Sequence, residues 1–194
     1  MHGHGEPCPF LRILDPDMSI DFTHNYFELF GLAPRFAIDV EALERTYREL
    51  QSRVHPDRYA HLADTEKRLS MQWATRVNEA FQTLRKPLPR ARYLLELRGH
   101  DVAHESNTAM SPAFLMDQME WREAVEEARS GANCDELEAL RHRLMAHADE
   151  VMAEAATALD DTGENVAAAD AVRRLMFLEK LRHDIEDALE QLDS

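Results

Sequence analysis

Apolar side chains recur at spacings of three and four residues along most of the chain, which is the period of an amphipathic α-helix. The pattern predicts one long helix that Asp39 caps and that runs to Val54, and a second that Asp64 caps and that runs to Leu84. Their short connection makes the two helices antiparallel, so that each buries its apolar stripe against the other. The stripes are Val40, Leu43, Tyr47, Leu50 and Val54 in the first helix, and Leu69, Trp73, Val77, Ala80, Phe81 and Leu84 in the second.

A shorter apolar segment precedes this hairpin. Asp21 and Thr23 are candidate caps for it, and Gly31 and Pro34 end it. Because so short a helix is not stable alone, we expect it to pack on the hairpin. Its apolar residues are Tyr26, Phe27, Leu29 and Phe30.

The second half of the chain predicts three further long helices. Pro87 and Pro89 are expected to end the hairpin, and residues 91–98 form a brief apolar helix before a polar loop. Ser111 followed by Pro112 is typical of a helix start, running to about Arg129. Asn133 and Glu136 form a capping-box pattern, which predicts the start of the second of these helices. The third is expected beyond a turn at residues 160–165.

No segment shows the alternation of a β-strand, so the fold class is all-α. We expect an antiparallel helical hairpin with short helices, joined to a C-terminal three-helix bundle. The expected boundaries are an irregular arm at 1–17, a first domain at 18–92, a connector at 93–110 and the bundle at 111–194.

Composition and charge narrow the class of function. The net charge of −15 arises in residues 99–194, which hold 23 acidic and 8 basic side chains, whereas residues 1–98 hold 14 of each. Such an acidic half repels nucleic acid, so no nucleic-acid partner is expected. No apolar run is long enough for a membrane span, and the first residues lack the basic start and apolar core of a secretory signal. The 2 cysteines cannot form a disulfide framework, which favours a reducing, cytoplasmic setting.

The predicted helix over residues 112–128 has apolar residues on two faces. On a helical wheel, Phe114, Trp121, Val125 and Ala128 share one sector and are expected to face the bundle core. Leu115, Met116, Met119 and Glu123 lie on the far side, where an ordinary bundle helix is polar. This second face either packs on the connector helix or the first domain, or forms an exposed partner site that Phe177 of the last helix joins.

The loop between the hairpin helices opens with His55, Pro56 and Asp57. Pro56 forces the preceding residue out of the helical region and makes a rigid corner. A catalytic dyad is disfavoured because no nucleophile or phosphate-binding loop accompanies it. A metal site would need more ligands than this loop offers, and His2, His4 and Cys8 also lack a completing cluster, so neither a metal nor another cofactor is expected. A simple turn or a protein contact remains, and the arginine-bearing helix before the loop favours the contact.

Five stretches of the sequence together resemble a known family. NYFELFGL, YRELQSRVHPDRYA and NEAFQTLRKPLPRARYLLELRG are similar to a J domain, and AFLMDQMEWRE and AAADAVRRLMFLEKLR extend the similarity to the HscB family of iron–sulfur cluster co-chaperones. The resemblance covers essentially residues 18–194. It implies that the protein is a co-chaperone without catalytic activity of its own.

The resemblance also implies partners and contact residues. The J domain would stimulate the ATPase of a specialised heat-shock chaperone (HscA), and the bundle would bind the scaffold protein (IscU) on which clusters are assembled. The expected scaffold contacts are Leu115, Met116, Met119, Glu120, Arg122, Glu123 and Phe177. The expected ATPase contacts are His55, Pro56, Asp57 and Arg58 with Arg45, Arg48 and Arg53 of the preceding helix.

Departures from the family pattern are few. Arg58 stands where a lysine is usual, and Met119 stands where leucine is common. The N-terminal arm lacks the paired CxxC motifs of eukaryotic relatives, which favours a bacterial type. A general J-domain co-chaperone that delivers unfolded clients, an enzyme that uses His55 and Asp57, and a helical adaptor with an inert loop are the alternatives.

Overall fold

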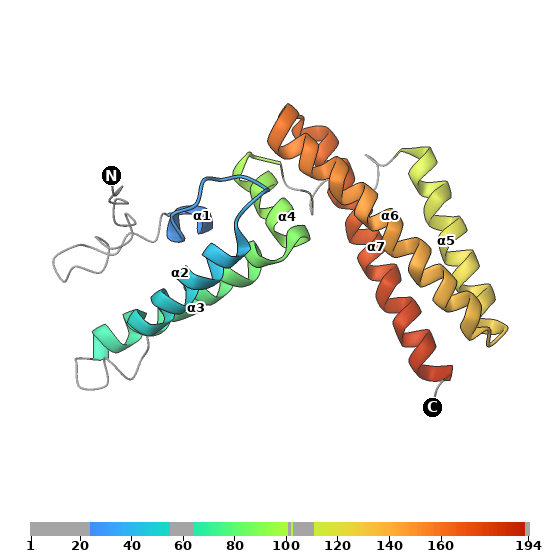
Figure 1. Cartoon of the computed structure of the whole chain (residues 1–194), viewed down its shortest axis with the longest axis horizontal. Coiled ribbons are helices and arrows are strands. Elements are labelled where there is room, and N and C mark those ends of the chain that lie inside the picture. Colours follow the sequence, from blue (N-terminus) through green and yellow to red (C-terminus); the bar gives the residue numbers. More distant parts are fainter. Residues whose placement is uncertain (1–23, 55–63, 101, 103–110, 193–194) are drawn as a thin grey trace, which may run out of the picture. The chain divides into compact units, whose positions relative to one another are not determined.

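The computed structural model describes residues 24–54, 64–100, 102 and 111–192. Helices are the only regular elements within these ranges, so the predicted all-α class is confirmed. The chain divides into two compact units, Met1–Arg90 and Ala91–Ser194 (Figure 1). Of the helices in the described ranges, none is long and apolar enough to cross a membrane.

The first unit is built on the predicted hairpin of α2 (Val40–Val54) and α3 (Asp64–Arg85) (Figure 1). The Asp39 carboxylate caps α2, because its Oδ1 accepts a hydrogen bond from the Ala42 N–H at 2.9 Å. Tyr47 of α2 stacks on Phe81 of α3 with ring centroids 3.8 Å apart, and its hydroxyl donates to Asn78 Oδ1 at 2.8 Å. The buried stripe residues between the two helices are Leu43, Leu50, Trp73, Val77, Ala80, Phe81 and Leu84.

The short helix α1 (Tyr26–Leu29) packs on α3, as expected. Its cap is Asn25, which the sequence analysis did not select; Asp21 and Thr23 lie outside the described residues. Asn25 and Glu28 form a reciprocal capping box, with N–H to carboxylate and N–H to amide oxygen distances of 2.9 and 3.0 Å. Arg76 of α3 fixes the entry to α1 by donating to the His24 carbonyl oxygen at 2.6 Å.

The two prolines after α3 begin a helix rather than a connector. The prediction that the next helix starts at Ala91 was wrong by one turn, since α4 spans Pro87–Leu97. Proline lacks an N–H, and the first turn of a helix has no intrahelical acceptor for that N–H, so Pro87 and Pro89 cost α4 no hydrogen bond. Arg90 is buried, and its guanidinium donates to the Leu84 carbonyl oxygen at the end of α3.

The second unit contains α5 (Pro112–Ser130), α6 (Cys134–Thr157) and α7 (Asn165–Leu192), the predicted three-helix bundle (Figure 1). Ser111 caps α5 by accepting from the Phe114 N–H at 3.2 Å, with Pro112 in the first position. Asn133 caps α6 through the Glu136 N–H at 3.1 Å, which is one half of the predicted capping box. The longest core stripes are Leu137, Leu140, Leu144 and Val151 in α6, and Val172, Leu175, Leu178, Leu181 and Ile185 in α7.

The turn between α6 and α7 begins as a π-helical turn, η4 (Ala158–Thr162), and ends at Gly163. Gly163 has a φ of 70°, a conformation that glycine adopts without steric cost. Arg98, which follows α4, donates to the Leu159 carbonyl oxygen at 2.9 Å and to Asn165 Oδ1 at 3.1 Å. One side chain therefore ties both ends of this turn to the segment that leads out of α4.

The adjacent residues Leu144 and Met145 of α6 test the assignment of the bundle core. Leu144 is 1% exposed and Met145 is 51% exposed. We expect Leu144→Ala to lower the free energy of unfolding by about 2–5 kcal/mol, because it removes buried methyl groups and leaves a cavity. Met145→Ala is expected to change it by less than about 0.5 kcal/mol. Urea unfolding followed by circular dichroism measures both, and equal effects would contradict the assignment.

Candidate functional site

Helix α5 uses one of its two apolar faces to build the bundle. Phe114, Trp121, Val125 and Ala128 are all buried, as the helical wheel predicts. Arg143 of α6 lies over the Trp121 ring, 4.4 Å from its centroid, and covers the edge of this face. The orientation of α5 about its own axis is therefore fixed by its core stripe, which determines where the other face points.

The opposite face of α5 exposes large apolar side chains. Leu115 is 42% exposed, Met116 64% and Met119 69%. Single exposed apolar residues are normal on a protein surface, but three within two turns of one helix are typical of a contact site. The neighbouring charged residues that the sequence analysis selected are also exposed: Glu120, Arg122 and Glu123.

Phe177 of α7 lies beside this face, although it is 62 residues from Leu115 in sequence. Its half-buried ring meets Phe114 edge-to-face, with centroids 6.0 Å apart and an interplanar angle of 89°. The guanidinium of Arg122 lies 5.5 Å from the Phe177 centroid. The structure thus brings Phe177 to α5 through two direct contacts. We call Leu115, Met116, Met119 and Phe177 the apolar patch.

The three arginines that are expected to contact the ATPase lie on α2, which also carries three glutamates. Arg45 and Arg48 are exposed and three residues apart, so they are neighbours on the helix surface. Arg45 approaches Asp39 and Glu41 at 3.9 Å each, whereas Arg48 makes no ion pair within the described part of the chain. Arg53 lies in the last turn of α2, and its side chain is outside the description. His55, Pro56, Asp57 and Arg58 lie outside the described residues.

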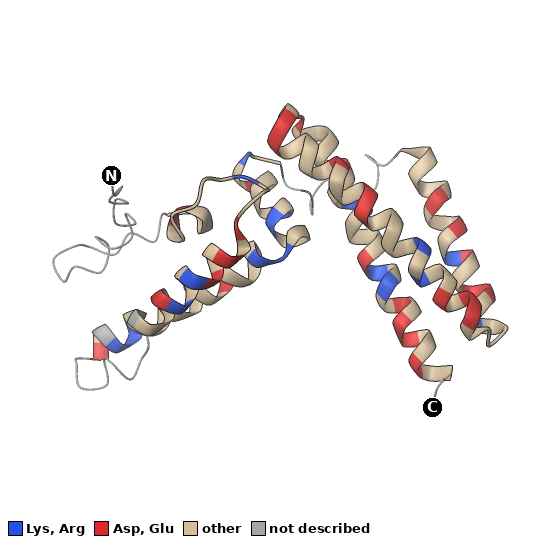
Figure 2. Cartoon of the chain, viewed as in Figure 1, with Lys and Arg blue, Asp and Glu red and all other residues tan. Residues whose placement is uncertain are grey.

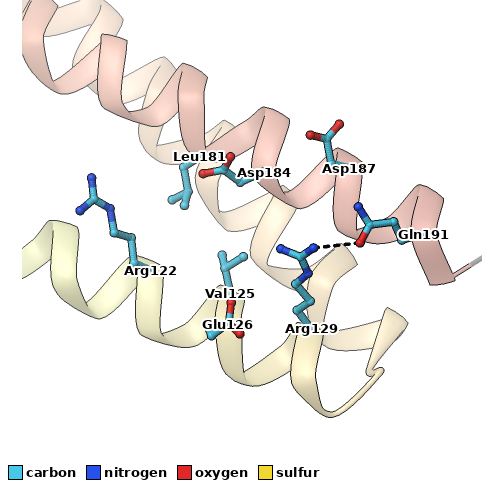
Figure 3. A pocket seen from close by; sticks show the side chains of 8 residues that line it. All are labelled: Arg122, Val125, Glu126, Arg129, Leu181, Asp184, Asp187 and Gln191. Atoms are coloured by element: carbon cyan, nitrogen blue, oxygen red, sulfur yellow. Dashed lines mark hydrogen bonds between the residues drawn. The ribbon is translucent and has the colours of Figure 1, made fainter.

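A groove between α5 and α7 was not anticipated from the sequence. It has a volume of about 440 Å³ and lies between Arg122, Val125, Glu126 and Arg129 on α5 and four residues of α7 (Figure 3). Val125 and Leu181 are buried and form its apolar floor. The pattern of each helix shows its own faces, but it does not show which faces of two distant helices meet, so no sequence signal indicated the groove. Its α7 residues are Leu181, Asp184, Asp187 and Gln191.

The bundle is rich in carboxylates, as Figure 2 shows for α5 and α7. Arg182 is a basic residue of the bundle that pairs with two carboxylates. Its Nη2 lies 3.0 Å from Oε1 of Glu179, and its Nη1 lies 2.5 Å from Oε1 of Glu186. The hydrogen bonds that Arg182 donates to the Glu179 carboxylate are the main cause that raises the pKa of Arg182 above its usual value. This arginine is therefore fully charged and already paired.

In the ranges that the structure describes, no three histidine, cysteine, aspartate or glutamate side chains are grouped to hold a metal ion. Cys134 is a half-buried free thiol at the start of α6. His2, His4 and Cys8 lie outside the described residues.

A helical hairpin whose helix α2 exposes Arg45 and Arg48, followed by an acidic bundle with an exposed apolar patch, is the arrangement of a J-domain co-chaperone with a C-terminal helical domain. The chain is 63% identical over 177 residues to the "Co-chaperone protein HscB homolog" of Azoarcus sp. (strain BH72), covering 91% of this chain and 100% of that protein. It is 61% identical over 177 residues to the homolog of Aromatoleum aromaticum, with the same coverage. The chain therefore belongs to the HscB family, and it is a co-chaperone of iron–sulfur cluster biogenesis.

Further comparisons agree with this assignment. The model of the HSCB C-terminal oligomerisation domain matches residues 110–186. Among solved structures, chaperone HscB from Vibrio cholerae has a TM-score of 0.76 and 38% identity, covering 87% of this chain and 99% of that one. Human co-chaperone protein HscB has a TM-score of 0.84 and 26% identity, covering 100% of this chain and 95% of that one. These relatives are named as chaperones or co-chaperones.

Proposed function

We propose that this protein binds a scaffold protein of the IscU type through the apolar patch and presents it to a heat-shock ATPase of the HscA type in the cytoplasm. The single observation that carries the scaffold assignment is the exposure of Leu115, Met116 and Met119 beside Phe177. Apolar side chains surrounded by charged ones are typical of protein–protein contacts. Methionine side chains are flexible, so this surface can adapt to its partner.

The first unit supplies the contact with the ATPase in this proposal. Arg45 and Arg48 are exposed on α2, and the long, exposed ion pairs of Arg45 contribute little free energy, so both cations can steer an acidic partner surface. His55, Pro56, Asp57 and Arg58 follow α2 directly in the sequence and continue the contact, as the family resemblance implies. Neither contact requires bond chemistry by this chain, because the hydrolysis of ATP that it stimulates takes place on the partner.

The proposed division of labour follows the domain boundaries expected from the sequence, with residues 18–92 facing the ATPase and residues 111–194 facing the scaffold. Joining the two contacts in one chain raises the effective concentration of scaffold at the ATPase. A co-chaperone of this kind therefore accelerates delivery even where each separate contact is weak.

The loop is tested by the isosteric change Asp57→Asn. We expect it to abolish stimulation of ATP hydrolysis by the HscA-type chaperone in a single-turnover assay, because it removes one contact charge without changing the size of the side chain. Circular dichroism should show unchanged helicity. Asp149→Asn, on the exposed surface of α6, is the charge-matched control and should stimulate fully. Full stimulation by the Asp57 variant would rule out the role proposed for the loop.

The apolar patch is tested by Leu115→Ala combined with Phe177→Ala. We expect the dissociation constant for the IscU-type scaffold to rise by at least about tenfold in calorimetry, since truncating central apolar contacts costs more than 1 kcal/mol. Met145→Ala removes an exposed methionine from α6, outside the patch, and should leave the affinity unchanged. Unchanged affinity in the double variant, with its helicity intact, would show that the patch does not bind the scaffold. Binding of denatured proteins in preference to the scaffold would instead favour a general co-chaperone.

A further inference from the structure

We propose that the groove between α5 and α7 extends the scaffold-binding surface and holds a lysine- or arginine-bearing segment of the same partner. This inference rests on the proposed function, because it takes the scaffold to be the protein that docks on the apolar patch. The groove is lined by Arg122, Val125, Glu126 and Arg129 of α5 and by Leu181, Asp184, Asp187 and Gln191 of α7 (Figure 3).

The groove is continuous with the apolar patch. Arg122 links the two: its guanidinium lies over the Phe177 ring of the patch, and its side chain forms one end of the groove (Figure 3). Leu115, Met119, Arg122, Glu126 and Arg129 follow one another at spacings of three and four, so they form one stripe along α5. A partner segment that leaves the patch along this stripe enters the groove without crossing another element.

The carboxylates of the groove have no cationic partner within the described part of the chain. Asp184 and Asp187 are exposed, three residues apart on α7, and take part in no ion pair there. Glu126 on the α5 side accepts a hydrogen bond from the Ser130 hydroxyl at 3.3 Å, and it makes no ion pair with any described residue. Three acidic groups of one groove are thus available to an incoming cation.

The arginines in and beside the groove have partners other than these carboxylates. Arg129 donates to Gln191 Oε1 at 2.9 Å, which closes the other end of the groove (Figure 3). Arg182 is held by Glu179 and Glu186, and Arg122 lies over Phe177. Arg122 and Arg129 are seven residues apart, or about 10 Å along the helix axis, so they cannot together hold one anion. The groove is therefore complementary to a cationic side chain rather than to an acidic one.

The apolar floor determines how such a side chain would lie. Val125 and Leu181 are 7% and 2% exposed, and they lie between the charged residues of the two walls. Lysine and arginine bury an aliphatic stem on apolar surface while their charge remains in contact with water and carboxylates. A volume of about 440 Å³ accommodates one or two such side chains of an extended segment.

The test compares Asp184→Asn combined with Asp187→Asn against the intact protein. Calorimetry with the full-length chain and the IscU-type scaffold at low salt should show a dissociation constant raised by about three- to tenfold. The difference should shrink at 1 M salt, where the screening length falls to about 3 Å. Asp149→Asn combined with Asp161→Asn removes the same charge from exposed positions outside the groove and should bind like the intact protein.

The outcomes separate this inference from the proposed function. If the groove variant binds as tightly as the intact protein, or more tightly, while Leu115→Ala with Phe177→Ala still weakens binding, the groove inference is overturned and the proposed function stands. If the patch variant also binds normally, both are overturned. The inference is supported if the groove variant loses affinity in a salt-dependent way while the Asp149 and Asp161 control does not. Carbodiimide coupling of Asp184 or Asp187 to a scaffold lysine supports it as well.

Discussion

Burial of one face of α5 against α6 and α7 is the constraint on which the second unit and its candidate site depend. Phe114, Trp121, Val125 and Ala128 recur at the helical period, so burying them fixes the rotation of α5 about its axis. Once that rotation is fixed, Leu115, Met116 and Met119 must point away from the core. Their exposure is a geometric consequence of the same stripe that stabilises the bundle. The stability of the bundle and the proposed scaffold contact therefore depend on different faces of one helix.

The sequence was sufficient for much of the fold because most elements carry local signals. The stripes of α2, α3, α5, α6 and α7 set the number of long helices, and Asp39, Ser111 and Asn133 cap helices where the pattern predicted. The errors lie where two local signals compete. Prolines both end one helix and begin the next, so Pro87 looked like a break although it starts α4. Asn25 was missed because Asp21 and Thr23 are equally good caps by residue type alone.

The candidate site also has one part that follows from local sequence signals and one part that does not. The two faces of α5 follow from its own periodicity, so the exposure of Leu115 and Met119 was predictable. The contacts of Phe177 with Phe114 and Arg122 join helices that are distant in sequence, and no pattern within α7 alone reports them. The same is true of the groove, whose walls belong to α5 and α7. Only packing shows which wall faces which, so the groove carboxylates could not be grouped from the sequence.

The uneven use of cations explains why carboxylates of the bundle remain open to a partner. Residues 99–194 hold 8 basic side chains for 23 acidic ones, so most carboxylates cannot find a partner within the unit. Several of these cations lie over aromatic rings: Arg143 covers Trp121 and Arg122 covers Phe177. Neither arginine makes an ion pair within the described residues. The bundle therefore retains a negative surface beside an apolar one. In the proposal for the groove, that pairing selects a partner segment which carries both an apolar and a cationic side chain.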